Sequence, residues 1–497
     1  MDPSTYGELV GNEDCLCLNI WRPATEENDL PVFFWIHGGG NSIGEAGVGV
    51  YDGKHMAHNS NVIVVTVNYR LGPFGWFNHS ALKTGDVLSD SGNFGTLDLI
   101  KALRWVSTNI SHFGGDPGNV TVAGQSAGGY NVLSLMLSPL VEGRFHRAVV
   151  QSGPLMSTSS VEEGLEKAQN VFTELLVADG YSTEEAQEFI DSRPRQELAA
   201  YLRSKVPEDI YTHYPQALSG GLGELFPPFQ DGAVIPQDGW KSFIRGNYNK
   251  VPIIVGANKD EVKLFLPFVL SEGKDHGFYN LAMHFDPDNS MDLSQVCDYL
   301  GMSLLWIPVY EPVSAIASGV MEFMSVDLTA SILSRHQENI YAYRFEWDDE
   351  PAPFDLLTGG SHSIEIPFVF GNFDREENSK WRYAWNEDNR IGRERLSEAM
   401  MSYWAQFVYT GNPNREDLPP WHPWSDSPGG SRRIVFDSDA SNILAACHAN
   451  KNCYCTVNNK EPDDAAKEEL STRVITVFEN LWTSYLGDIE NIADGVK

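Results

Sequence analysis

The sequence NVTVAGQSAGGYNVLSLM, residues 119–136, joins a predicted strand to a predicted helix through one glycine-rich turn. Residues 119–123 are β-branched and apolar, as in a buried strand, and apolar residues at i, i+3 and i+4 within 132–136 indicate a helix. A strand that turns sharply into a helix at Gly-x-Ser-x-Gly is a nucleophile elbow, which exposes the serine hydroxyl. Ser126 is therefore the candidate nucleophile.

A second match to the same pattern, GNSIG, occupies residues 40–44. With 44 glycines in the chain, about 0.3 matches are expected by chance, so the surrounding sequence must decide between the two. Only a glycine-rich run, residues 45–49, follows this second match, without a helical period. We therefore reject Ser42 and retain Ser126.

Several short segments are apolar and β-branched without alternation, as strands covered on both faces should be. They are residues 31–36, 62–67, 120–123, 148–151, 252–255 and 340–345. Helical patterns such as 97–110 lie between them. This alternation predicts an α/β fold, with a mostly parallel central sheet covered by helices on both faces.

Two long stretches interrupt the alternation, at roughly residues 157–236 and 266–335. The first carries helical patterns over 162–179 and 185–204, and the second is largely helical. We expect both to be insertions that cap the active site where the strands end, within a single domain spanning 1–497.

The formal net charge of −33 disfavours nucleic acid and anionic membranes as partners. The most apolar long region, residues 304–333, is interrupted by Glu311, Glu322 and Asp327, so no membrane span of ~20 apolar residues is predicted. The opening residues 1–5 carry neither a charged nor an apolar signal region, so no secretory signal is predicted in this numbering. Localisation and oligomeric state are left open.

Six cysteines are present, and three of them lie close together near one histidine: Cys447, His448, Cys453 and Cys455. Their spacing fits no common zinc pattern, so we predict no metal site, and a loop disulfide or free thiols is preferred. No cofactor is predicted. A last amphipathic helix is predicted near residues 472–486.

A serine hydroxyl needs a base, and the base needs an acid that orients it. In a fold with a nucleophile elbow the chain order is nucleophile, acid, base. Asp260 and Glu261 both follow the strand 252–255, and spacing leaves both open as the acid. His362 is the first histidine after the strand 340–345, which makes it the candidate base.

An oxyanion hole requires backbone N–H groups aimed at one point. The run His-Gly-Gly-Gly at residues 37–40 directly follows the strand 31–36, and glycines let the amides approach without side chains in the way. A tight turn at the strand end is the alternative interpretation. The N–H of Ala127 is the expected third donor.

Further short motifs are spread along nearly the whole chain. They are EDCL (13–16), LNIW (18–21), WIHGGG (35–40), NYRLG (68–72), FGGDP (113–117), the elbow (124–128), QSG (151–153), NKDE (258–261) and His362 followed by EIPFVFG (365–371). Jointly they are highly specific, and the chain resembles the carboxylesterase/cholinesterase family, the type B carboxylesterases of the α/β-hydrolase fold.

The resemblance implies a serine carboxylesterase that hydrolyses small-molecule esters through an acyl-enzyme intermediate. The roles it implies are nucleophile, acid and base for Ser126, Glu261 and His362, and oxyanion-hole donors for Gly39, Gly40 and Ala127. It thereby favours Glu261 over Asp260. It also implies that Ser152 lies near the triad and that Glu365 and Arg70 are structural.

The chain departs from the family pattern at several positions. Gln125 stands where a glutamate usually precedes the nucleophile, which argues against a site tuned for a cationic choline ester. Ser363 stands where a glycine usually follows the histidine. Only twelve residues precede Glu13, so Cys15 lacks its usual disulfide partner. Either an N-terminal part is missing, or this is a shortened variant with a more open site.

Two alternative functions are weighed, one from the breadth of the family and one from the short N-terminal part. The family includes adhesion proteins that lost the serine, and retention of Ser126, Glu261, His362 and the glycine run disfavours such a binding protein. The other alternative is a truncated esterase of low activity. Acyl and alcohol specificity are not predicted.

Overall fold

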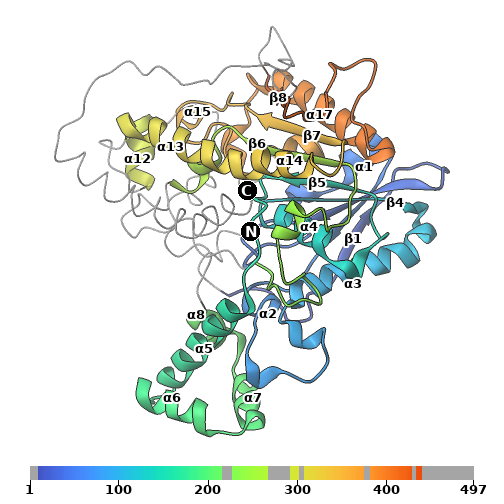
Figure 1. Ribbon diagram of the computed structural model, residues 1–497. Helices are drawn as coiled ribbons and strands as arrows, with labels where there is room; N and C mark the ends of the chain where they lie inside the picture. Colours follow the sequence, from blue (N-terminus) through green and yellow to red (C-terminus); the bar gives the residue numbers. More distant parts are fainter. Residues whose placement is uncertain are drawn as a thin grey trace.

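The computed structural model describes residues 9–214, 227–266, 292–300, 307–373, 381–427 and 432–438. Within them the strands form one sheet in the order β1-β3-β2-β4-β5-β6-β7-β8 (Figure 1), and β1 alone is antiparallel to its neighbour. The strands are β1 (Leu18–Trp21), β2 (Leu30–Ile36), β3 (Ile63–Val67), β4 (Gly115–Gln125), β5 (Arg147–Gln151), β6 (Ile253–Asn258), β7 (Ile340–Phe345) and β8 (Ile434–Phe436). The predicted mostly parallel sheet is confirmed, and each predicted strand overlaps an observed one.

Helices cover both faces of the sheet, as the continuous apolar strands predict. Phe34 and Trp35 are neighbours on β2 and enter opposite cores, because successive side chains of a strand point to opposite faces. On the Phe34 side the sheet packs against α3 (Phe94–Asn109) and α4 (Ala127–Leu137), and on the other side against α17 (Arg390–Thr410). All of β2 is consequently buried.

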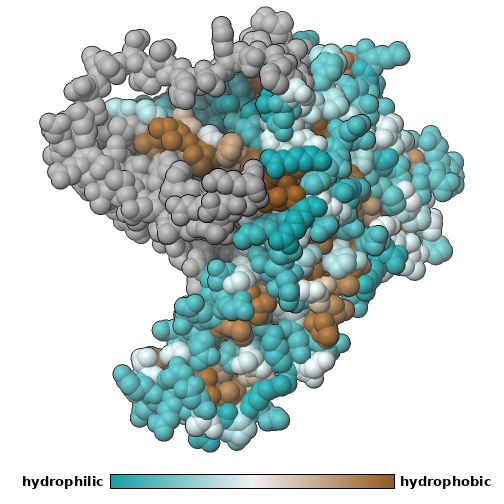
Figure 2. Space-filling model, in the orientation of Figure 1, coloured by the Kyte–Doolittle hydropathy of each residue, from teal (hydrophilic) through white to brown (hydrophobic). Residues whose placement is uncertain are grey.

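The stretch predicted to be the first insertion, roughly residues 157–236, contributes an arm of four helices that extends away from the sheet (Figure 1). The visible surface of this arm is mostly hydrophilic (Figure 2). The four helices are α5 (Val161–Ala178), α6 (Thr183–Ser192), α7 (Arg195–Ser204) and α8 (Pro207–His213). The helical pattern predicted over 185–204 is divided between two helices, since α6 ends before Pro194 and α7 begins after it. Proline disfavours the helical conformation in the residue before it, which separates the two helices.

The stretch predicted to be the second insertion, roughly residues 266–335, contains α12 (Leu293–Leu300), α13 (Ile307–Glu322), the π-helical turn η9 (Phe323–Asp327) and α14 (Leu328–Leu333). Contrary to the sequence-based expectation, the helical stretch Tyr310–Leu333, 24 residues long, is long and apolar enough to cross a membrane by length and composition. However, 56% of its most apolar window is buried inside the protein. Ser318 Oγ also accepts the Val262 N–H at 3.1 Å, so α13 packs as a core helix does.

Two predictions concern the C-terminal part of the chain. The helix predicted near 472–486 and the cysteines from Cys447 to Cys455 lie outside the described residues. Among the described cysteines, Cys15, Cys17 and Cys297 are free. The capping role expected for both insertions stays a prediction.

The strands that precede the candidate site residues end at one edge of the sheet. Gln125 pairs with Gln151, and Gln151 pairs with Gly256, so β4, β5 and β6 end side by side. Gly124 also pairs with Ile36 at the end of β2. In parallel sheets of this kind, sites form just beyond the carboxyl ends of the strands.

Gly124 and Gly128, the glycines on either side of the turn after β4, have no room for a side chain. A Cβ on Gly128 would lie 2.0 Å from the Ile36 carbonyl oxygen, and a Cβ on Gly124 would lie 2.4 Å from the Gly128 carbonyl carbon. Backbone atoms cannot move aside as a flexible side chain can. The approach of α4 to β2 therefore depends on glycine at both positions.

We predict that Gly128→Ala lowers the free energy of unfolding by about 3 kcal/mol or more, because its methyl group overlaps the β2 backbone. Gly319→Ala is the matched control, since it also lies within a helix and nothing is within 4 Å of its added Cβ. That control should gain about 0.5–1 kcal/mol. Denaturant unfolding of both variants measures the difference, and equal stability of Gly128→Ala and the parent protein would contradict the elbow packing.

Candidate active site

Ser126 lies between β4 and α4 with a strained backbone, φ 56° and ψ −124°. Its N–H donates to the Gln151 carbonyl at 2.8 Å, which ties the turn to β5. Its side chain does not cap α4. The hydroxyl is therefore free of a structural role at the helix start, where the helix dipole favours negative charge.

Glu261 begins the short helix η7 (Glu261–Leu264) directly after β6 and is fully buried. One carboxylate oxygen accepts from Ser152 Oγ at 2.5 Å and from the Asn258 N–H at 2.8 Å. The other is hydrogen-bonded to His362 Nδ1. Three donors thus satisfy a carboxylate that burial would otherwise disfavour.

Asp260 is also buried, but its carboxylate points to a different partner. It forms an ion pair with the buried Lys263 at 3.2 Å, and Lys263 also pairs with Glu311 of α13 at 2.7 Å. The two acids that sequence spacing could not separate therefore have different surroundings. Glu261 contacts the candidate histidine, whereas Asp260 pairs with Lys263, which in turn reaches α13.

His362 lies in the loop after β7, is 3% exposed, and has the Phe265 ring 5.1 Å from its own ring. Its Nε2 lies 3.2 Å from Gln125 Nε2. Among the described residues, no hydrogen bond joins Nε2 to Ser126 Oγ. Catalytic hydrogen bonds of this type are often long without substrate and shorten in its complex.

The glycine run after β2, residues 38–40, leads into a hydrogen-bonded turn. Gly39 and Gly40 have positive φ angles of 107° and 62°, and the Gly39 carbonyl accepts the N–H groups of Ser42 and Ile43, both at 3.0 Å. Ser42 Oγ also points to that carbonyl at 3.3 Å. Ser42 thus belongs to a turn, not to a strand–helix elbow, whereas Ala127 is the first residue of α4.

A buried polar network supports the acid and the histidine loop. Glu365 accepts from Gln151 Nε2 at 3.1 Å and from Asn258 Nδ2 at 2.6 Å, and Asn258 Nδ2 also donates to the Ser361 carbonyl at 2.7 Å. Burial, and then the charge of Glu261, raise the pKa of Glu365 to about 7. Asn258 had no role assigned from sequence, because only the folded chain brings its two partners together.

The other family-implied residues occupy structural positions. Arg70 forms an ion pair with Asp98 at 2.7 Å. The most important contact that sequence reasoning missed joins Gln125 to Ser363, whose Oγ donates to Gln125 Oε1 at 3.1 Å. Both positions depart from the family pattern, and these joint departures were the signal from which the contact could have been predicted.

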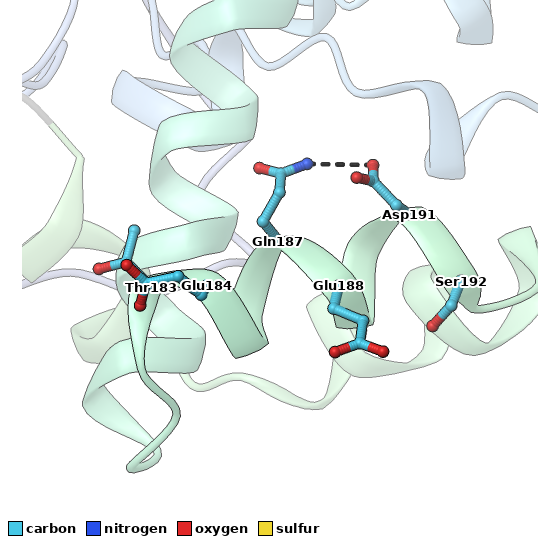
Figure 3. Close-up of a pocket in the computed structure, with 6 residues that line it drawn as sticks. All are labelled: Thr183, Glu184, Gln187, Glu188, Asp191 and Ser192. Carbon is cyan, nitrogen blue, oxygen red and sulfur yellow. Dashed lines mark hydrogen bonds between the residues drawn. The ribbon is translucent and has the colours of Figure 1, made fainter.

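A shallow hollow on the arm offers no comparable chemistry. It lies along α6 and is lined by Thr183, Glu184, Gln187, Glu188, Asp191 and Ser192 (Figure 3). Gln187 and Asp191 are paired with each other at 3.0 Å. The described part of the chain also holds no group of three His, Cys, Asp or Glu side chains suited to a metal ion.

Comparison with known proteins gives concordant matches. The model of the carboxylesterase family matches residues 1–446. Para-nitrobenzyl esterase of Bacillus subtilis (strain 168) is 32% identical over 437 residues, which cover 84% of this chain and 79% of that protein. Carboxylesterase 1F of Mus musculus is 32% identical over 447 residues, which cover 85% of this chain and 74% of that protein. A solved structure of PNB esterase has a TM-score of 0.62 at 28% identity and covers 87% of this chain and 82% of its own.

The raised pKa of Glu365 predicts a pH dependence of stability. The folded protein keeps a proton that the unfolded chain loses above its ordinary pKa of 4.5, so this stabilisation is full below pH 4.5 and is lost as the pH rises through about 7. The loss amounts to about 3 kcal/mol. Glu365→Gln should remove this slope, measured by denaturant unfolding at pH 5 and pH 8. Burial also raises the pKa of Glu350, but this residue is present in both the parent protein and Glu365→Gln, so its contribution cancels in the comparison. Identical dependence of stability on pH in the two proteins would contradict the prediction.

Proposed function

The chain belongs to the carboxylesterase family and has the α/β-hydrolase fold, and on that premise we propose that it hydrolyses carboxylic esters through an acyl-enzyme on Ser126. His362 is the general base and Glu261 the acid that orients it. The observation that carries this proposal is the hydrogen bond between His362 Nδ1 and the buried Glu261, at the sheet edge where Ser126 stands on its strained turn.

Acylation begins when Ser126 Oγ attacks the ester carbonyl and its proton passes to His362 Nε2. The hydrogen bond to Glu261 holds the Nδ1–H tautomer and stabilises the imidazolium that forms. The N–H groups of Gly39, Gly40 and Ala127 receive the oxyanion, each donor being worth about 3 kcal/mol in related sites. The alcohol leaves with the proton, and water repeats the sequence on the acyl-enzyme.

Several features of these donors support their role. Among the described residues, none of the N–H groups of Gly39, Gly40 and Ala127 donates to a backbone carbonyl. They are therefore free to bind a substrate oxygen. Because the helix dipole adds positive potential at Ala127, negative charge that develops there is stabilised further.

The substrate class we propose is a small ester with an uncharged alcohol group. The side chain next to the nucleophile is the amide of Gln125, which is 1% exposed and carries no charge to attract a quaternary ammonium. p-Nitrophenyl esters of increasing acyl length suit a first survey of specificity. A binding protein without activity, or an esterase of low activity, would be revealed by the same survey.

Ser126→Ala should reduce ester hydrolysis by about 10⁴-fold or more, as removal of a nucleophile does. Ser42→Ala is the matched control, because it alters the other Gly-x-Ser-x-Gly sequence and removes only a hydroxyl within a turn. Initial rates with a p-nitrophenyl ester measure both variants. Retained activity in Ser126→Ala, or its loss in Ser42→Ala alone, would refute the assignment of the nucleophile.

Glu261→Ala should lose about 10³-fold or more of kcat, because His362 then lacks the acceptor that fixes its tautomer. Asp260→Ala should lose far less activity, although its stability should fall because Lys263 is deprived of one partner. Steady-state kinetics, with circular dichroism to verify folding, distinguish the two variants. The opposite ranking in folded proteins would assign the acid to Asp260.

A further inference from the structure

Gln125 and Ser363 form a buried pair beside His362. Gln125 is 1% exposed and Ser363 is 6% exposed. The Ser363 hydroxyl donates to Gln125 Oε1 at 3.1 Å, and Gln125 Nε2 lies 3.2 Å from His362 Nε2. The chain Ser363–Gln125–His362 thus reaches the nitrogen that must accept the Ser126 proton.

The backbone of Ser363 adopts a conformation that is unfavourable for a residue with a side chain. Its φ of 75° lies in the left-handed region, where a residue with a Cβ is disfavoured by about 1–2 kcal/mol relative to glycine. Glycine would relieve that strain but would leave Gln125 Oε1 without its donor. The position therefore combines backbone strain with one specific hydrogen bond.

The tautomer of His362 determines which group donates the hydrogen bond between Gln125 and His362. Since Nδ1–H donates to Glu261, the neutral imidazole presents a lone pair at Nε2. The Gln125 amide can donate an N–H to that lone pair while its oxygen accepts from Ser363. When Nε2 is protonated, a turned amide can present its oxygen instead, because a hydroxyl can also accept from the amide N–H.

We propose that Gln125 and Ser363 are a positioning pair that holds the lone pair of His362 Nε2 in the resting enzyme and accommodates both of its protonation states. This inference rests on the proposed role of His362 as the base. A carboxylate in place of the amide could only accept hydrogen bonds, so it would favour the imidazolium. The amide can instead donate to the neutral imidazole, and it adds no negative charge beside the base.

Other titratable groups also face His362 and must be separated from this effect. Glu261 faces it from η7, and Glu365, whose pKa burial raises to about 7, faces it from the start of α16 (Ile366–Phe370). Tyr343 of β7, which is close to both of these carboxylates, stays uncharged because burial raises its pKa well above 10. Gln125→Glu in both the parent and the Glu365→Gln background distinguishes the contributions.

The first experiment measures kcat/KM for a p-nitrophenyl ester against pH. In Gln125→Glu the acid limb should move to higher pH by about one unit, in both backgrounds. Ser363→Ala removes the hydroxyl and keeps the Cβ, whereas Ser363→Gly removes both. Both substitutions should lower kcat severalfold with little change in KM. Ser363→Gly should lose this activity even though relief of the backbone strain moves its unfolding midpoint to a higher denaturant concentration. Full activity in Ser363→Gly, or an unmoved acid limb in Gln125→Glu, would overturn the pair.

The second experiment does not need esterase activity. In protein labelled with ¹⁵N-histidine, the His362 signals are identified by their loss in His362→Gln and followed against pH. Their midpoint should be higher in Gln125→Glu than in the parent protein, and equal midpoints would overturn the proposal. A shifted midpoint in a protein that hydrolyses no ester would preserve the pair and refute the proposed function, so the two failures remain distinguishable.

Discussion

The backbone of Ser126 is the constraint on which the rest of the site depends. A positive φ at a residue other than glycine costs of order 1–3 kcal/mol and persists only where the surroundings fix it. Here the surroundings are the Gln151 carbonyl, which accepts the Ser126 N–H, and the β2 backbone, which lies against Gly128. Because β2, β4, β5 and β6 end together, the same contacts bring the glycine run and the acid loop to that serine.

Backbone strain recurs in the residues around this turn. Ser152 and Ser363 also have positive φ, 52° and 75°, and each directs its hydroxyl to a group that contacts His362. Ser152 donates to the acid, and Ser363 donates to Gln125. The remaining non-glycine residues with positive φ in the described ranges are Asp29, Asn41 and Asn61, side chains that tolerate this conformation. Strain in serines is thus concentrated where the chemistry is proposed to occur.

The sequence predicted the sheet because its buried strands are short, β-branched apolar runs that alternate with helical patterns along the chain. It did not predict the edge strands β1 and β8, which have four and three residues and are too short for a clear pattern. Asp260 and Glu261 are adjacent and chemically alike, so spacing could not separate them, whereas packing gives each a different partner. The contact between Ser363 and Gln125 spans 238 residues and depends on the complete fold.

The most direct test of the account is to locate a covalent adduct. The protein would be treated with a fluorophosphonate, which reacts with an activated serine, then digested and analysed by tandem mass spectrometry. One adduct per chain is expected, on Ser126, and it should form more slowly as the pH falls through the acid limb of ester hydrolysis. An adduct on Ser42 or another serine, or none on a folded protein that hydrolyses esters, would contradict the central claim.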